Sequence, residues 1–215
     1  MAQASALPRP DSYAAWREQR RAVRKRNPVA IGWNHLISVL LLGEGPADLP
    51  ALLATIESLK AQTYRNVELI VACPGVPDAL ADMDAAGLRG LFVYPALNAA
   101  AFLSGGESER LWRGDYALLA PAGSTFEEDA LALLNTTVGR DPVPGLVTCD
   151  YDTGKESGLT PHILPGWDPD LIQSRNYLRN AFIVSRVLIS AQRVNVQPGP
   201  GRPASIQDRL RHLGQ

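Results

Sequence analysis

The chain has 215 residues, of which 46% are hydrophobic, and a formal net charge of −1 at pH 7. This length suits one domain with a full hydrophobic core, and the near-neutral charge does not favour nucleic acid as a partner. No apolar run is long enough to predict a membrane span, and the N-terminus lacks the apolar core of a signal peptide.

The N-terminal region divides into two parts. Residues 1–12 contain small residues and prolines without an apolar period, which predicts disorder. Residues 13–30 contain a basic helix, in which helical spacing places Tyr13, Trp16 and Val23 on one side. Two interpretations remain open: a solvated helix packed by Trp16, or a helix that contacts an anionic membrane surface or an acidic partner. Its cations are Arg17, Arg20, Arg21, Arg24, Lys25 and Arg26.

Nearly continuous apolar runs predict strands that are buried on both faces of a sheet. These strands are expected at residues 36–42, 67–72, 91–94, 116–120 and 145–150. Helices are expected at residues 48–62, 78–87, 98–103 and 125–137, and a final one at residues 205–214. This alternation predicts an α/β fold with a mostly parallel, doubly wound sheet flanked by helices, in a single domain.

Several residues mark the expected ends of these helices. Asp48 is a plausible N-cap with Pro50 in the first turn, and Gly87 suits the position after a helix. Thr125 and Glu128 have the spacing of a capping box. Beyond Asp152 the pattern becomes irregular.

Both cysteines, Cys73 and Cys149, stand at the ends of apolar runs. This position favours two buried free thiols over a disulfide bond. Free thiols fit a reducing compartment, so we expect a cytoplasmic protein.

The loop after the fourth predicted strand, residues 120–123, stands where open α/β sheets hold their ligands. It reads Ala-Pro-Ala-Gly and carries no charge, thiol or imidazole. A second feature, Asp150-Tyr151-Asp152, directly follows the fifth predicted strand. The three histidines, His35, His162 and His212, lack the spacing of metal ligands.

Several segments together resemble the family-2 glycosyltransferases of GT-A fold, in particular the rhamnosyltransferase-like bacterial subgroup that builds O-antigen and other surface polysaccharides. The resemblance runs along most of the chain and implies a GT-A domain over residues 36–215, without the further C-terminal elements that close the acceptor side in the family. It is carried by SYAAW, LISVLLL, IESLKAQTYRNVELIV, GDYALLAPAGSTFEEDALALL, GLVTCDYD, GWDPDLIQSRNYLRNAFIVSRVLI and SIQDRLRHL.

The resemblance implies a donor region from which the family's polar residues are missing. The family's Asp-x-Asp motif, which holds a divalent metal on the donor diphosphate, falls on residues 120–122, or on residues 121–123 in the next register. Leu-Leu-Gly-Glu at residues 41–44 replaces the nucleotide-pocket segment, and Val-Ala-Cys-Pro at residues 71–74 replaces the base-binding aspartate. No cofactor is therefore expected, and Mn²⁺ or Mg²⁺ only if activity is retained. The donor-region residues are Glu44, Cys73, Ala120 and Ala122.

On the acceptor side, the chain matches more of the family's polar residues. Asp208 matches the aspartate that deprotonates the acceptor hydroxyl, although an ordinary surface acid is the other interpretation. Trp167, Asp168 and Asp170 match a segment near the acceptor cleft, where Trp167 either stacks on a sugar ring or packs in the core. In this register residues 150–152 fall one strand after the metal motif, so a turn or cleft-lining role is favoured there over metal binding.

Three functions remain open. In the first, the chain is a glycosyltransferase that uses a nucleotide sugar, with Asp208 as base and Arg175 or Arg179 in place of a metal. Alternatively it is a non-catalytic relative that binds glycans, or that pairs with an active glycosyltransferase at the inner face of the membrane through its basic helix. Thirdly, a partner polypeptide completes the site. The simultaneous loss of three donor motifs favours the non-catalytic alternative.

Overall fold

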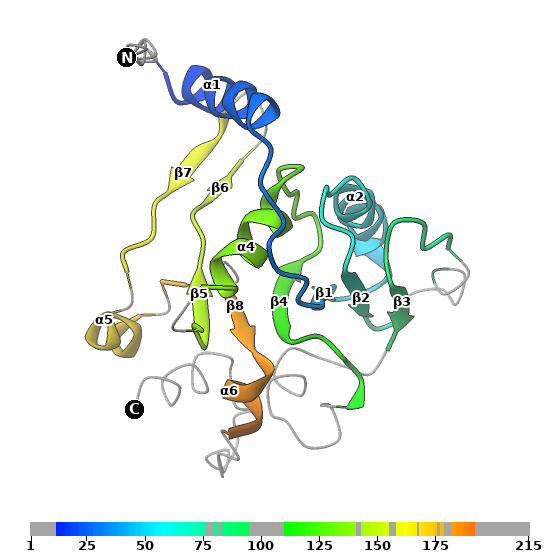
Figure 1. Ribbon diagram of the computed structural model, residues 1–215. Coiled ribbons are helices and arrows are strands. Elements are labelled where there is room, and N and C mark those ends of the chain that lie inside the picture. Colours follow the sequence, from blue (N-terminus) through cyan, green and yellow to red (C-terminus); the bar gives the residue numbers. More distant parts are fainter. Residues whose placement is uncertain are drawn as a thin grey trace, which may run out of the picture.

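The computed structural model describes the following residues, to which every structural statement below refers: 12–75, 80, 83–94, 110–140, 143–154, 158–166, 168–175, 177–178 and 182–191. Its centre is a six-stranded sheet of order β3-β2-β1-β4-β8-β5 (Figure 1). The strands β1, β2, β3 and β4 are parallel, and β8 is antiparallel to both β4 and β5. The predicted mostly parallel α/β sheet is therefore confirmed. The strands are β1 (Ile37–Leu42), β2 (Val67–Ala72), β3 (Gly90–Val93), β4 (Tyr116–Pro121), β5 (Leu146–Thr148) and β8 (Phe182–Ser185).

Helices cover both faces of this sheet. Side chains on one face of the central strands, such as Leu41 and Leu118, share a core cluster with α2 and α4. Side chains on the other face, such as Leu40 and Leu119, share a second cluster with α5 and α6. Burial on both faces explains why the central strands read as continuous apolar runs. The helices are α1 (Tyr13–Arg26), the 3₁₀ helix η1 (Pro46–Asp48), α2 (Leu49–Lys60), α4 (Ala130–Val138), α5 (Pro169–Ser174) and α6 (Arg186–Ala191).

The basic helix α1 confirms the predicted helix, with Ser12 as its N-cap. No residue of α1 is buried, and the Trp16 side chain is 41% exposed. Trp16 stacks on Tyr13, with ring centroids 5.4 Å apart. The helix is therefore solvated, as the first interpretation expects, and Trp16 contacts Tyr13 and Arg20 of the same helix. The acidic partner of α1 is instead a set of carboxylates in the same chain, described below.

Two predicted helix boundaries need correction. The helix α4 begins at Ala130, so Thr125 and Glu128 do not start it. The reason is tertiary: the N–H of Phe126 donates to the Ser58 hydroxyl at 2.7 Å, which holds this segment as a loop against α2. Asp48 does precede α2, but its carboxylate caps no helical N–H and instead accepts from the N–H of Glu44 at 2.6 Å.

Other parts of the chain were not predicted in detail. The short strands β6 (Tyr151–Thr153) and β7 (Thr160–His162) form a separate antiparallel pair. Residues 83–89 form turns, not the end of a helix over residues 78–87, although Gly87 has the positive φ of 85° that its predicted role requires. Both cysteines are free thiols, as expected; Cys73 is buried and Cys149 is half-buried.

The remaining expectations lie outside the described residues. They concern residues 1–11, the helix at residues 98–103 and the helix at residues 205–214. Among the described helices, none has the length and apolar character needed to cross a membrane.

Candidate functional site

The three segments of the predicted donor region meet at one end of the sheet, called here the carboxyl edge: residues 43–45, 73–75 and 120–123. Leu42 of β1 pairs with Ala72 of β2 and with Pro121 of β4, so these strands end side by side. In open α/β sheets this end is where ligands bind. The segments that the sequence assigns to the donor region therefore lie side by side, and the question becomes what these residues can bind.

Side chains fill the part of the carboxyl edge between β1 and β2, whereas Glu44, Pro121 and Gly123 are exposed. Cys73 is completely buried, Ala120 is 2% exposed, and the Cys73 thiol donates to the Gly45 carbonyl over 3.3 Å. A Cβ atom added at Gly43 would lie 2.5 Å from the Cys73 sulfur, and one added at Gly75 would lie 3.0 Å from the Pro46 ring. These separations leave no gap between the β1 and β2 segments at this level.

Several backbone donors of the carboxyl edge are also occupied. The N–H of Gly43 donates to the Ala72 carbonyl at 3.0 Å, and the N–H of Ala122 to the Leu42 carbonyl at 2.7 Å. The N–H of Gly123 is shared between the Thr55 hydroxyl at 3.0 Å and the Ala51 carbonyl at 3.2 Å. Loops that bind phosphate instead point free N–H groups at the ligand. The N–H groups of Ala122 and Gly123 are thus satisfied by acceptors in β1 and α2.

The electrostatics of this edge do not favour an anion. Burial raises the pKa of the Cys73 thiol, and the nearby Asp48 carboxylate raises it further. Glu44 is exposed next to them. A neutral thiol and two acids give no positive charge for a diphosphate.

The donor set also does not fit a divalent cation. Mn²⁺ and Mg²⁺ require several oxygen ligands, and the side chains of residues 120–123 contain none. Throughout the described part of the chain, no group of three or more His, Cys, Asp or Glu side chains is arranged to hold a metal ion. Nothing in the observed geometry supports a metal at this edge.

The second Asp-x-Asp feature is engaged in structural contacts. The Asp150 carboxylate accepts from the N–H of Leu164 at 2.8 Å. The Asp152 carboxylate accepts from the Tyr13 hydroxyl and pairs with the Arg17 guanidinium at 3.2 Å. Asp152 thus connects β6 to α1.

The acceptor-side candidates are described only in part. Asp168 is the N-cap of α5, where its carboxylate accepts from the N–H groups of Asp170 at 3.0 Å and Leu171 at 2.8 Å. Asp-Pro-Asp is a signal for this cap that the sequence analysis did not use. Asp170 and Arg175 are exposed at the two ends of α5. The remaining candidates, Trp167, Arg179 and Asp208, lie outside the described residues.

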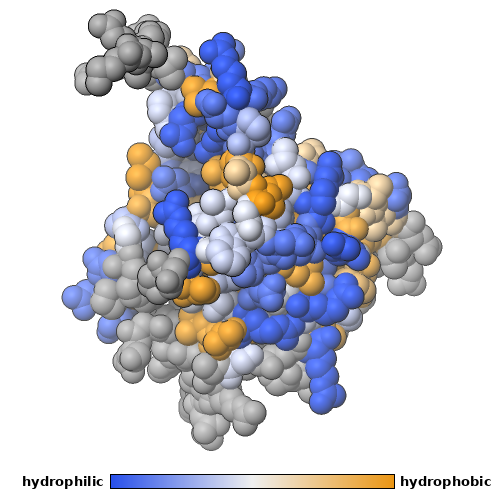
Figure 2. Space-filling view, in the orientation of Figure 1, coloured by the Kyte–Doolittle hydropathy of each residue, from blue (hydrophilic) through white to orange (hydrophobic). Residues whose placement is uncertain are grey.

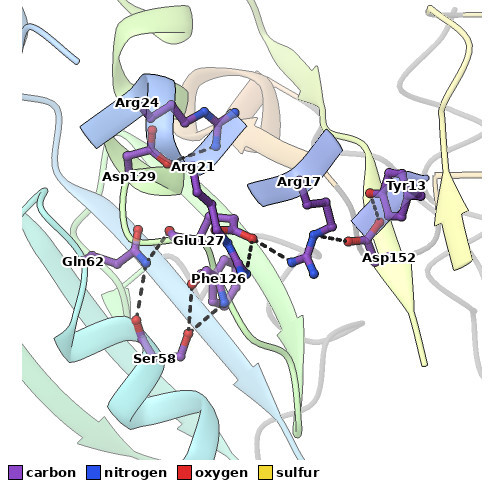
Figure 3. Close-up of polar contacts among 10 residues, drawn as sticks. All are labelled: Tyr13, Arg17, Arg21, Arg24, Ser58, Gln62, Phe126, Glu127, Asp129 and Asp152. Carbon is purple, nitrogen blue, oxygen red and sulfur yellow. Dashed lines mark hydrogen bonds and ion pairs between the residues drawn. The ribbon is translucent and has the colours of Figure 1, made fainter. Parts of the chain in front are cut away.

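One cluster of charged residues was missed altogether. Arg17, Arg21 and Arg24 of α1 meet Glu127 and Asp129, which lie in the loop before α4 (Figure 3). The signal was present as an acidic segment, Glu-Glu-Asp at residues 127–129, in a chain that also carries a basic helix. Because residues 127–129 were assigned to the start of a helix, their pairing with the basic helix was not predicted.

The chain matches no protein-family model. Among curated proteins it is similar to an uncharacterized protein, y4gI, of Sinorhizobium fredii, with 28% identity over 184 residues, 81% of this chain and 20% of the relative. The chain therefore spans about a fifth of the length of that relative.

This chain is also similar to several solved structures, among them TarS 1-349 and the mannosyltransferase PcManGT. TarS 1-349 of S. aureus has a TM-score of 0.51 and 12% identity over 81% of this chain and 53% of that one. The mannosyltransferase PcManGT of Pyrobaculum calidifontis, solved in complex with GDP-Man and Mn²⁺, has a TM-score of 0.48 and 15% identity over 83% of this chain and 53% of that one. This chain spans about half of each. The likeness to TarS shows a GT-A-like fold, as predicted; a shared fold does not transfer an activity.

Proposed function

We propose that this chain is a glycosyltransferase-like domain that does not use a metal-bound nucleotide sugar, and that it serves as a non-catalytic glycan-binding or scaffold unit for an active glycosyltransferase. The observation that supports this most directly is the packing of the carboxyl edge. Cys73 is completely buried there, and the loop at residues 120–123 has its backbone donors occupied.

The proposal follows from what a nucleotide sugar requires. Its diphosphate carries negative charge that a cation or free N–H groups must neutralise. The carboxyl edge has Asp48 and Glu44 beside a neutral thiol, and the N–H of Glu44 already donates to Asp48. A diphosphate at this edge would meet two acids, and it would have to displace the present partners of the N–H groups of Gly43, Glu44, Ala122 and Gly123.

The remaining role is one of recognition. By the resemblance to transferases of surface polysaccharides, the ligand is a saccharide or the partner is such a transferase, at the cytoplasmic face of the membrane. A scaffold binds its partner through the outer surface of the GT-A-like fold. This role does not require an open site at the carboxyl edge.

Isothermal titration calorimetry tests the proposal. The purified chain is titrated with UDP, dTDP and GDP, each with and without Mn²⁺, and an active metal-dependent transferase serves as positive control. We expect no heat of binding for this chain, with folding and monodispersity checked by circular dichroism and size exclusion. Micromolar binding of any nucleotide contradicts the proposal and favours a transferase.

The same titration separates the two kinds of transferase. Binding without a metal would favour the mechanism in which Arg175 or Arg179 neutralises the phosphates and Asp208 acts as base. Binding only with Mn²⁺ would require carboxylate ligands such as Asp150 and Asp152, which must then leave their present contacts. Titration with fragments of bacterial surface polysaccharides tests the glycan-binding role directly.

A further inference from the structure

The helix α1 lies against the domain without entering its core. It crosses one end of the β6–β7 pair (Figure 1), and none of its residues is buried. Its surface is mostly hydrophilic in the view of Figure 2. Tyr13, Arg17, Arg21 and Arg24 follow one another at intervals of four, four and three residues, which places them on a single helical face. This face is the one that makes the polar contacts to the domain.

The contacts of this face reach two separate parts of the domain. Arg17 and Arg21 both bind Glu127, and each has an N–O distance of 2.7 Å. Arg24 pairs with Asp129 at 3.1 Å. Arg17 also pairs with Asp152 of β6 at 3.2 Å, so its guanidinium lies between two carboxylates (Figure 3). The helix therefore joins the loop before α4 to the β6–β7 pair.

The loop that receives α1 is held independently of it. The Gln62 side chain donates to the Glu127 carbonyl at 2.8 Å and accepts from the N–H of Leu131 at 3.0 Å. The N–H of Thr63 donates to the Glu128 carbonyl at 2.8 Å. The end of α2 thus fixes the loop backbone, so the loop can keep its shape when α1 leaves.

The attachment of α1 is mainly electrostatic. The Arg21 guanidinium donates to both oxygens of Glu127, at 2.7 Å each, a geometry stronger than that of an isolated surface pair. This hydrogen bonding holds the pKa of Glu127 below its usual range, with the charges of Arg21 and Arg17 adding to it. The side chains of Glu127 and Arg21 are 31% and 45% exposed, so dissolved ions can compete for both.

The chain leaves helical geometry directly after the helix. Pro28 has no N–H to continue the helical hydrogen bonds, and Asn27 leaves helical geometry with φ −126° and ψ 77°. From Val29 onward the chain is anchored, because Val29 packs against the core and the Ala30 carbonyl accepts from Thr136. Motion of α1 can therefore start at Asn27 without disturbing the sheet.

From these contacts we propose that α1 is a reversible electrostatic strap. In its closed form the strap ties the loop before α4 to the β6–β7 pair. In its open form it exposes the carboxylates of Glu127, Asp129 and Asp152, and it frees its own arginines. Ionic competition, by salt or by an anionic surface, governs the change between the two forms.

Hydrogen exchange with mass spectrometry tests the strap. Exchange of the amides of residues 13–26 is measured in the whole protein over a series from low to about 1 M NaCl, where the screening length falls to about 3 Å. Glu127→Gln is compared with wild type, because it leaves the sequence of α1 and the Gln62 contact to the Glu127 carbonyl unchanged. Glu57→Gln is the matched control, since it removes one acid from an exposed i,i+3 pair on α2.

At low salt we expect the Glu127→Gln substitution to speed exchange in α1 by at least about tenfold, because two charge-assisted contacts are lost. Salt should speed exchange in wild type toward the same value and have little effect on the variant, whereas Glu57→Gln should behave as wild type. Equal exchange in wild type and Glu127→Gln at every salt concentration overturns the proposal. Faster exchange in the sheet strands of Glu127→Gln also overturns the proposal, because it would mean that the substitution unfolds the domain.

Discussion

Packing at the carboxyl edge predicts that Gly43 tolerates no side chain. The φ angle of Gly43 is not among the positive glycine values, so alanine is allowed there by the backbone itself. An alanine Cβ, however, would lie 2.5 Å from the Cys73 sulfur and 3.0 Å from the Cys73 Cβ. Cys73 is completely buried, so it has no solvent to move into.

The expected size of this effect combines two opposing contributions. Overpacking of a closed site destabilises by about 1–3 kcal/mol, and the lower entropy of the unfolded alanine chain offsets about 0.4–1 kcal/mol of that. We therefore expect Gly43→Ala to lower the free energy of unfolding by about 1–2 kcal/mol. Removing the sulfur with Cys73→Ala should relieve the clash, so the two substitutions should couple by about 1 kcal/mol or more.

Urea unfolding of wild type, both single variants and the double variant measures this coupling, provided that the slope with urea is unchanged. The corresponding shift of Tm is about 2–4 °C for each kcal/mol in a chain of this size. If Gly43→Ala is as stable as wild type and the coupling is below about 0.3 kcal/mol, the edge has room for a ligand. The structural argument for a non-catalytic role then fails with it.

Three further predictions concern buried and paired groups. Glu68, which is completely buried, accepts from the Ser38 hydroxyl at 2.6 Å and pairs with Arg113 at 2.9 Å. In urea unfolding, Glu68→Ala should therefore lower the free energy of unfolding by about 2–4 kcal/mol, whereas the control Glu57→Ala should change it by less than about 0.5 kcal/mol. Partial burial raises the pKa of Cys149 to about 11, so a disulfide reagent at pH 8 should label it about a hundredfold more slowly in the folded protein than in urea, and equal rates would contradict this raised pKa. Because the folded pKa of Glu127 is depressed, its stabilisation of α1 is full above the unfolded pKa and is lost as pH falls through the folded pKa. The protection of the α1 amides, which is the exchange rate corrected for its intrinsic pH dependence, should therefore fall in acid, and this fall should be smaller in Glu127→Gln, which keeps the pairs to Asp129 and Asp152.

The sheet could be predicted because its central strands are buried on both faces. A run such as residues 37–42 can have few other structures when every side chain lies in a core. The strands of three residues, β6 and β7, carry too short a pattern for this reasoning, whereas the strand expected at residues 145–150 is found as β5. The position of β8 between β4 and β5 depends on pairing between segments that are distant in sequence.

The loop before α4 shows how tertiary contacts override a local signal. Thr125 and Glu128 have the spacing of a capping box, and that pattern is correct in isolation. Ser58 of α2 and Gln62 just after α2 bind the same segment, so the helix begins only at Ala130. The loop lies 68 positions after Ser58 and 65 after Gln62 in these contacts, so a local sequence pattern cannot include them.

The adjacency of the segments at the carboxyl edge was predictable, but their packing was not. The resemblance located Cys73 and residues 120–123, and the strand register brings them together. Whether such residues leave a cavity depends on where the thiol of Cys73 points and on which N–H groups are used, and neither is encoded locally. The contact between Tyr13 and Asp152 spans 139 positions, so Asp152 could be read from sequence only as an unpaired acid.

The position of β8 has a consequence for synthesis of the protein on the ribosome. Until residues 182–185 emerge, the nascent sheet of β3, β2, β1 and β4 has an open side at β4, and β5 has no neighbour to pair with. An open strand side invites pairing with other chains. A chain stalled before β8 therefore loses two strands of the sheet instead of one, and it presents an aggregation-prone surface. Chaperone binding to such stalled chains should fall once β8 has been added.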